Sequence, residues 1–478
     1  MREDVEGAAA AMNSAPIEYL HLETGVILFF LAMVIQTEFG RAADPEYDVQ
    51  RGFAPLRWLP FAFLPMAVAF TRLLHGVSPL LGLELAAGIT LSLLHPVNAL
   101  CFMIHLLILR PWEIAADNPT LNLIPRFGFT LCILSWLIHS REQARLNWRG
   151  LRSVLFLIGF SAWLLVTMIK SPSIVMSVSD YFGTYFKTLM IFGMALLFVE
   201  NERSVREVEQ TLVISSLSII ASGIYQFLSG GMTTGRLKMF GMLGDPNDMG
   251  SIIVMALPFA LVPVFEQTSG AMTKAAGLIY AALAGAAIWL TRSRGTMLAV
   301  IAEFFVVRMV RSKKKRLGLI VIATLLGAGY IGLITLVPRQ AGDMEGSEAS
   351  RLTFWRSAVN MAAHNPVLGV GFGQFAENFM TYAVGPVFER GARTAHSTWF
   401  LALGESGFPG LLLFCAFFIS VARIAWRNRA ARPAQLYAVA GYGVAMSFLS
   451  HTYSMYLYIL LALVLASAGI RRRMDDGV

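Results

Sequence analysis

The sequence predicts an all-α fold: a polytopic transmembrane helix bundle of about 14 helices with one long, partly helical extracytoplasmic loop. Hydrophobic residues make up 56% of the 478 residues and charged residues 14%, against about 25% charged residues in a typical soluble domain. The apolar residues form runs close to the roughly 20 residues that a spanning helix needs. These runs are continuously apolar rather than alternating, so they fit β-structure poorly.

The apolar runs give the candidate spans in chain order. They are 17–36, 58–73, 79–95, 97–110, 121–139, 152–170, 182–200, 207–228, 246–265, 274–291, 295–311, 316–337, 399–424, 434–451 and 453–470. The short segments between 58 and 110 are interrupted by prolines, so the number of helices there is open. We expect N-terminal transmembrane helices at 1–200, a core at 201–427, and C-terminal transmembrane helices with a basic cytoplasmic tail at 428–478.

The basic residues predict the orientation of the chain. They gather in four clusters between apolar runs: Arg141 to Arg152, Arg308 to Arg316, Arg423 to Arg432, and Arg471 to Arg473. Because short cytoplasmic loops are enriched in Lys and Arg, the clusters belong in the cytoplasm. The net charge of +8 is therefore a topology signal and does not indicate nucleic acid. Three polar stretches then face the other side, and they are 229–246, Thr291–Gly295 and the loop 338–398.

The first polar stretch contains GRLKMFGMLGDPND. Arg236 and Lys238 are cations on the side that this topology disfavours, and an anionic ligand would explain them; a solvated loop is the alternative. Asp245, Pro246 and Asp248 form a helix-start signature of cap, first position and first turn. Capping is enough to account for both aspartates, and Asp248 is also a candidate for substrate binding.

The second polar stretch is the TRSRG turn at 291–295. Arg292 and Arg294 stand at the membrane edge, where long basic side chains extend to the interface without any further role. Arg294 is the candidate for ligand contact.

The third stretch, 338–398, predicts a helix over 350–363 that ends at His364, Asn365 and Pro366. At 100° per residue one arc of this helix is apolar, with Arg356 and Asn360 opposite. The arc consists of Phe354, Trp355, Ala358, Val359 and Ala362. Arg351 also falls within it, and a buried guanidinium needs a carboxylate, carbonyl groups or a phosphate. Glu345 or Glu348 could supply a structural salt bridge instead of a ligand.

Two further residues, at the end of the loop and just after it, are candidates for a chemical role. His396 precedes the next helix, and histidine can accept a proton near neutral pH. Glu405 follows within that helix, where it could orient His396 or pair with an arginine. His364 is expected only to end a helix. The GVGFGQF segment lacks the strand–turn–helix context of a nucleotide loop and is expected to be a flexible Gly-rich turn.

Taken together, these segments resemble the superfamily of O-antigen ligases and of O-antigen and exopolysaccharide polymerases. The resemblance rests on Arg351-xxx-Trp355, NPVLGVGFGQF and AHSTWFLALGESGFPGLLLF, with GRLKMFGMLGDPND and TRSRG similar to upstream elements of the family. It covers roughly 205–425. One departure is His396-Ser397, where the family often has His-Asn.

The resemblance implies a metal-independent glycosyltransferase of the bacterial inner membrane, without a cofactor. Its donor would be an undecaprenyl-diphosphate-linked glycan, and its acceptor a growing polysaccharide or a lipid A-core glycolipid at the periplasmic face. Arg236, Arg351 and His396 would match the family's essential arginines and histidine. Ligase and polymerase activities are not separated by these motifs. Two other classes remain as alternatives, a lipid-linked glycan flippase and a structural membrane scaffold.

Overall fold

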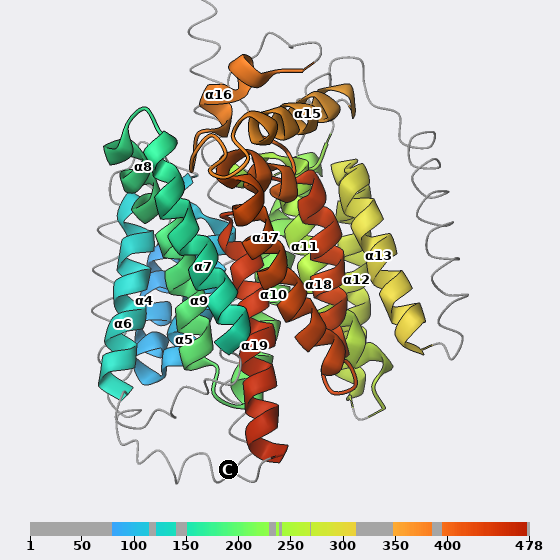
Figure 1. Ribbon diagram of the computed structural model, residues 1–478. Coiled ribbons are helices and arrows are strands. Elements are labelled where there is room, and N and C mark those ends of the chain that lie inside the picture. The colour runs from blue at the N-terminus through green and yellow to red at the C-terminus, as the bar shows by residue number, and fades with distance from the viewer. Residues whose placement is uncertain are drawn as a thin grey trace, which may run out of the picture. The chain divides into compact units, whose positions relative to one another are not determined.

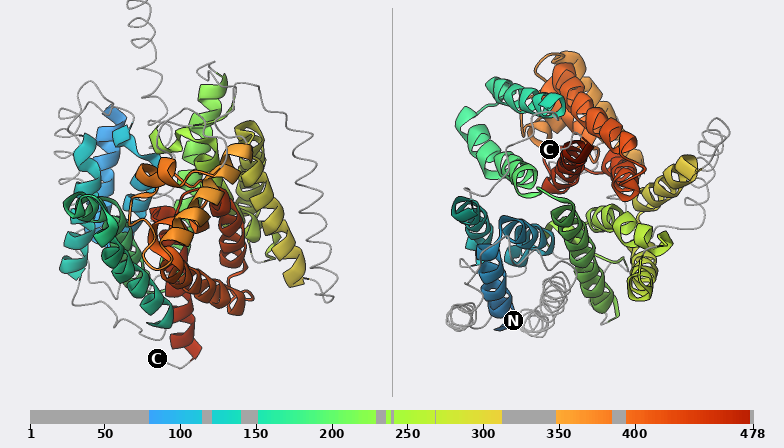
Figure 2. Two further views of the ribbon diagram at one scale, coloured as in Figure 1. Left: turned by 45° about the horizontal axis from the view of Figure 1, so that its top comes forward. Right: turned by 90° about the horizontal axis from the view of Figure 1, so that it is seen from below.

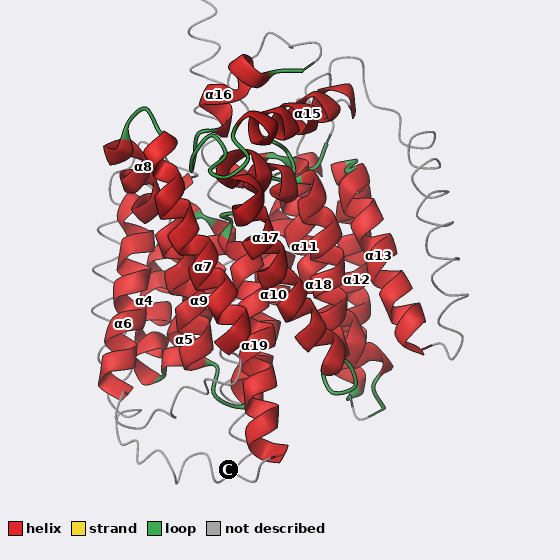
Figure 3. Cartoon of the chain, in the orientation of Figure 1, coloured by secondary structure: helices red, strands yellow, loops and turns green. Residues whose placement is uncertain are grey.

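The computed structural model describes residues 79–113, 121–139, 151–228, 236–238, 241–267, 269–311, 348–384 and 394–475. Throughout this part of the chain the regular elements are helices and no strand occurs (Figure 3), so the all-α prediction is confirmed. Seven described helices are long and apolar enough to cross a membrane, which confirms a multi-pass membrane protein. The candidate spans at 17–36, 58–73 and 316–337 lie outside the described residues.

The chain divides into two compact units, and each is described separately. The first comprises Met1–Ala144, Arg206–Met249 and Thr268–Thr291. The second comprises Arg145–Val205, Gly250–Gln267 and Arg292–Val478.

The first unit is a set of mostly apolar helices, some of whose buried polar groups pair between helices. Its helices are α4 (Pro79–Leu94), α5 (Pro96–Leu109), α6 (Ile124–His139), most of α10 (Glu202–Leu228) and α12 (Ala271–Thr291). His105 Nδ1 on α5 lies 2.9 Å from Ser215 Oγ on α10, and Ser216 Oγ lies 2.8 Å from Tyr280 OH on α12. In an apolar interior an unpaired polar group is costly, so these pairs fix which faces of the helices meet.

The second unit is built around one long helix, α17 (Thr398–Arg427), which packs against α7, α15, α18 and α19. The other helices of this unit are α7 (Leu151–Thr167), α8 (Ile174–Asp180), α9 (Phe186–Phe198), most of α11 (Pro246–Leu261), α13 (Arg294–Arg311), α15 (Glu348–His364), α16 (Phe375–Tyr382), α18 (Pro433–Ala445) and α19 (Met455–Asp475). Figure 1 shows α15 and α16 lying across the end of the unit at which α17 begins. Figure 2 shows α13 beside α18, in agreement with their contacts.

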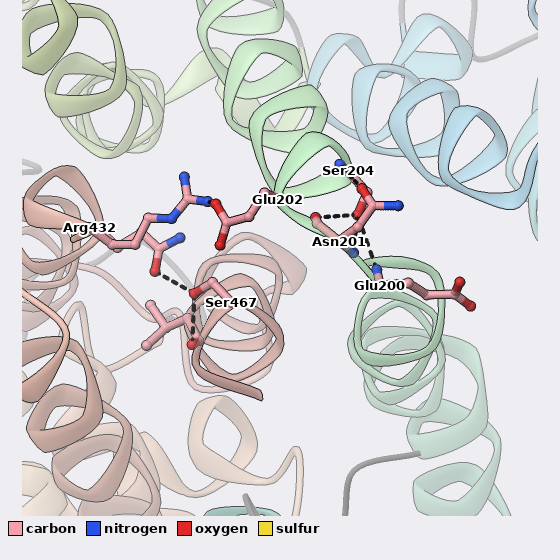
Figure 4. A network of polar contacts seen from close by, with 8 residues as sticks. Glu200, Asn201, Glu202, Ser204, Arg432 and Ser467 are labelled. Atoms are coloured by element: carbon pink, nitrogen blue, oxygen red, sulfur yellow. Dashed lines mark hydrogen bonds and ion pairs between the residues drawn. The ribbon is translucent and has the colours of Figure 1, made fainter. Parts of the chain in front are cut away.

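Polar contacts hold together the end of the second unit at which α18 begins (Figure 4). Arg432, just before α18, forms an ion pair with Glu202 at the start of α10. Ser204 Oγ accepts the Asn201 N–H at 3.0 Å, and Ser467 Oγ donates to Gln435 at 2.7 Å. Arg432 belongs to a basic cluster that the sequence predicts to be cytoplasmic. Its ion pair with Glu202 shows that this arginine also has a structural partner.

The helix α17 is broken at Gly407, whose backbone angles are φ 67° and ψ −170°. Pro409 has no N–H, so the carbonyl oxygen of Glu405, four residues earlier, lacks the donor that a regular helix supplies. Phe408 directs its N–H out of the helix to the carbonyl oxygen of Pro366 at 2.9 Å. The break thus leaves two carbonyl oxygens of α17 available to another segment.

The Gly-rich turn at 369–373 occupies this break. Val370 N donates to the carbonyl oxygen of Gly404 at 2.9 Å, and Gly371 N donates to that of Glu405 at 3.0 Å. Gly369 has φ 63°, and a Cβ there would lie 2.5 Å from the Gly404 oxygen, so a larger residue does not fit. The predicted Gly-rich turn is confirmed, and the carbonyl groups released by the helix break accept two of its N–H groups.

Candidate active site

The predicted helix in the long loop is confirmed as α15, which ends at His364. Its buried face packs against α16 and α17 and consists of Phe354, Ala358, Met361 and Ala362. Val359, which the apolar arc included, is 49% exposed, and Met361 is buried in its place. The predicted apolar arc was therefore displaced around the helix toward Val359. The face that α16 and α17 cover is the one that carries Phe354, Ala358 and Met361.

Arg351 lies one turn from the start of α15 and is half-buried. Its guanidinium carbon is 5.8 Å from the centre of the Phe448 ring, within the range of a cation–π contact. Phe448 belongs to the turn between α18 and α19. Glu345 and the side chain of Glu348, the alternative partners of Arg351, lie outside the described residues.

His396 stands two residues before the start of α17 in a left-handed conformation, with φ 45°. Such a conformation is uncommon for a residue other than glycine and persists where the surroundings enforce it. Thr398 supplies part of that enforcement, since its hydroxyl donates to the Leu449 carbonyl at 2.8 Å and accepts the His451 N–H at 3.0 Å. The His396 ring, half-buried, faces the Phe354 ring at 5.5 Å between centroids.

Arg351 and His396 both lie at the junction where α15 packs against the start of α17, since His396 contacts Phe354, three residues after Arg351. Trp355, one turn after Arg351, stacks on Phe400, four residues after His396 in the chain, with centroids 5.2 Å apart and planes 16° apart. The Trp355 ring also lies 6.4 Å from the Phe448 ring that Arg351 covers. Residues four apart share a helix face, so Arg351 lies on the side of α15 that carries this stack. His396, in the segment before α17, contacts the same helix through Phe354.

The TRSRG turn reaches the same junction from α13. Ser293 caps this helix by accepting the Thr296 N–H at 3.2 Å. Gly295, next to Arg294, packs so closely on Phe448 that an added Cβ would lie 3.2 Å from its side chain. Arg294 is half-buried at this point, whereas Arg292 is exposed. The structure therefore brings the start of α13 to the ring beneath Arg351.

Glu405 is placed differently from the expectation that it could orient His396. Its carboxylate accepts the Phe375 N–H at 3.1 Å and the Tyr453 hydroxyl at 2.7 Å. The Tyr453 hydroxyl is therefore a donor to this carboxylate. Glu405 thus joins the start of α16 to the turn before α19, and nothing in the sequence pointed to Tyr453 as its partner.

The candidates of the first unit have local structural contacts of their own. Arg236 Nε donates to the carbonyl oxygen of Thr291 at 3.0 Å, at the C-terminal end of α12 where carbonyls lack helical donors. Asp245 accepts the Asn247 N–H at 2.8 Å, and Asp248 lies in the first turn of α11, as the helix-start signature predicts. Lys238 is half-buried. That these residues join Arg351 and His396 stays a prediction.

Residues 279–415 match the family model described as O-antigen ligase. The resemblance to the O-antigen ligase superfamily is confirmed. The matched segment includes Arg294, Arg351, His396 and Glu405, whereas Arg236 lies before it. A search of curated proteins gave no match.

Three residues of the junction were not selected from the sequence as site residues: Phe400, Phe448 and Tyr453. Phe400 lies within the AHSTWF motif, so its position four residues after His396 was available as a signal. Phe448 and Tyr453 come from a turn about 50 residues later, and only the folded chain brings them to α15 and α17. No group of three metal-binding side chains occurs among the residues that the structure describes.

Proposed function

We propose that the protein transfers a glycan from an undecaprenyl-diphosphate-linked donor to an acceptor hydroxyl at the periplasmic face of the bacterial inner membrane. The observation that carries this proposal is the junction of α15 and α17, where Arg351 of α15 and His396, just before α17, lie near each other within the segment that matches the O-antigen ligase model. A guanidinium suits a diphosphate, and an imidazole suits a hydroxyl.

The reaction requires two charge movements that these residues can support. The acceptor oxygen bonds to the anomeric carbon, the bond from that carbon to the diphosphate oxygen breaks, and undecaprenyl diphosphate leaves with the bonding electrons. Arg351 stabilises the charge on the departing diphosphate, and the resemblance assigns Arg236 the same role. His396 orients the acceptor hydroxyl and takes its proton. Arg294 is a further contact for the donor, and no metal ion takes part.

Transfer by purified protein tests the assignment of His396, with His364 as the matched control. His364 is exposed at the end of α15, and its ring is 5.6 Å from that of Tyr382, so its replacement leaves the junction intact. His396→Ala should lower the transfer rate by about 10²- to 10⁴-fold, the usual contribution of a general acid–base group, while His364→Ala retains most activity. Transfer at the wild-type rate by folded His396→Ala would remove this residue from the mechanism.

One observation favours the flippase alternative, since broken helices in membranes are typical of transporters. In α17, however, the carbonyl groups released by the break are bonded to the Gly-rich turn, and Trp163 donates to the Ser406 carbonyl at 2.9 Å. This arrangement supports a structural role for the break. Formation of a new glycosidic product by purified protein would exclude simple transport.

The acceptor is identified by the glycans of a deletion strain. A polymerase predicts loss of chain length with a single repeat still attached to its acceptor. A ligase predicts full-length polymer that remains on the lipid carrier.

A further inference from the structure

Three of the described tryptophans, Trp163, Trp355 and Trp399, pack at the N-terminal third of α17. Their indole nitrogens differ in whether they have a hydrogen-bond acceptor. Trp163 donates to the Ser406 carbonyl oxygen at 2.9 Å, and Trp399 donates to Ser447 Oγ at 2.9 Å. The indole nitrogen of Trp355 is buried and has no acceptor within the described part of the chain. A buried donor without an acceptor is rare in proteins and calls for a specific explanation.

Stacking alone does not require an indole at position 355. The face of the Trp355 ring lies on Phe400, and a phenylalanine could supply a similar stack. What tryptophan adds is the N–H group, and the α15–α17 junction supplies it with no acceptor. The N–H is therefore unexplained by the packing of the protein with itself.

The surroundings of this donor point to an anionic acceptor. Trp355 follows Arg351 by four residues on α15, so the two side chains share a helix face, and both lie against Phe448. The same indole stacks on Phe400, and the neighbouring Phe354 contacts the ring of His396. A ligand oxygen held by the Arg351 guanidinium is thus the nearest kind of acceptor that the proposed reaction brings to Trp355.

We propose that the indole N–H of Trp355 donates a hydrogen bond to a diphosphate oxygen of the lipid-linked donor, beside the Arg351 guanidinium. This assignment rests on the proposed function. The nitrogen is covered in the structure, so the oxygen reaches it after a side-chain shift of the kind that is common on binding. Arg351 and Trp355 then act as a pair of donors from one helix face, one charged and one neutral.

The test compares two replacements of Trp355 with a control in which the indole is paired. Trp355→Phe removes the N–H and keeps an aromatic ring, and 3-benzothienylalanine at this position replaces only the N–H by sulfur. Trp163→Phe is the matched control, because its N–H bonds to the protein itself. Binding of undecaprenyl diphosphate to each purified protein is measured together with the thermal midpoint and the rate of glycan transfer.

Both replacements at Trp355 should raise the Kd for undecaprenyl diphosphate by about 10- to 100-fold, as expected for loss of a hydrogen bond to a charged oxygen. Their thermal midpoint should equal or exceed that of the wild type, since no bond within the protein is lost. Trp163→Phe should show the reverse, an unchanged Kd and a lower midpoint.

An unchanged Kd in the benzothienylalanine protein would overturn the assignment, as would a fall in its midpoint as large as that of Trp163→Phe. If that outcome occurs while the wild type transfers glycan and His396→Ala does not, the proposed function stands and only the assignment of Trp355 is withdrawn. If the wild type neither binds undecaprenyl diphosphate nor transfers glycan, the proposed function fails and the assignment fails with it.

Discussion

Two buried glutamates of the second unit, Glu405 and Glu303, differ in what their carboxyl groups contact. Glu405 on α17 is 3% exposed and accepts hydrogen bonds from Phe375 and Tyr453, which belong to two other segments. Glu303 on α13 is 5% exposed, and its Oε1 has no hydrogen-bond partner among the described residues. It packs against α18, where a Cβ on Gly441 would lie 2.2 Å from that oxygen.

The difference separates two ways in which a carboxyl group can be tolerated inside a helix bundle. Glu405 is satisfied, so it links the loop that carries α16 to the helix that follows His396. Glu303 is not satisfied at Oε1 and is accommodated by the absence of a side chain on α18. We therefore expect substitutions at the two positions to differ both in magnitude and in what they disturb.

The largest loss of stability is expected from Glu405→Ala. It leaves the Phe375 N–H and the Tyr453 hydroxyl without an acceptor and opens a cavity, at a cost of about 3–5 kcal/mol. The thermal midpoint of the purified protein and its yield in the membrane measure this loss. Glu405→Gln keeps an acceptor oxygen and should retain most of the stability. If Glu405→Ala melts at the wild-type temperature, the link between the loop and α17 is not what holds the junction.

A smaller loss is expected from Gly407→Ala at the break in α17. The backbone conformation there is almost confined to glycine, and a Cβ would lie 2.4 Å from the Val367 carbonyl oxygen, so the cost is about 2–3 kcal/mol. Gly373→Ala is the control, because its φ of 73° is also positive but no atom lies within 4 Å of its Cβ. It should cost about 1 kcal/mol, the backbone term alone. Equal effects of the two substitutions would show that the close approach at Gly407 contributes nothing.

Gly441→Ala tests the contact of α18 with Glu303. Crowding of a packed interior costs about 1–3 kcal/mol, and we expect the thermal midpoint to fall accordingly. Combining this change with Glu303→Ala should recover part of the loss, as neighbouring sites are not additive. Full additivity of the two substitutions would contradict direct contact. Gly469→Ala, which has no atom within 4 Å of its Cβ, should leave the midpoint nearly unchanged.

The smallest effect is expected from Glu303→Gln, within about 0.5 kcal/mol of the wild type. The amide keeps the shape of the carboxyl group, and the unpaired Oε1 loses no hydrogen bond. Thermal unfolding and glycan transfer of the purified variant check this. A large loss of transfer with an unchanged midpoint would give Glu303 a functional role that the packing does not indicate.

Local signals in the sequence predicted several elements correctly because short-range chemistry determines them. Asp245 and Pro246 predicted the start of α11, and His364 with Pro366 predicted the end of α15. The apolar runs likewise predicted the spanning helices, since their length is set by the bilayer.

The details of the junction depended on contacts between distant segments, and periodicity carries no information about these. Val359 was expected to be buried and is exposed, because α16 and α17 cover only one side of α15. The contact of the Gly-rich turn with α17 joins residues more than 30 positions apart in the sequence. Pro409 was a local signal for the helix break, but not for the segment that binds there. The pairing of Glu405 with Tyr453 and the unpaired indole of Trp355 had no signal in the sequence.

The most direct test of the account is glycan transfer from a lipid-diphosphate donor by purified Arg351→Lys protein, with EDTA present. Lysine keeps the charge but not the planar fork that binds phosphate oxygens in pairs, so it should not replace a guanidinium that clamps a diphosphate. The account predicts a folded protein with a normal thermal midpoint and a transfer rate lowered by about 10²- to 10³-fold. Wild-type transfer by Arg351→Lys, or complete inhibition of the wild type by EDTA, would contradict a metal-independent arginine clamp at the junction of α15 and α17.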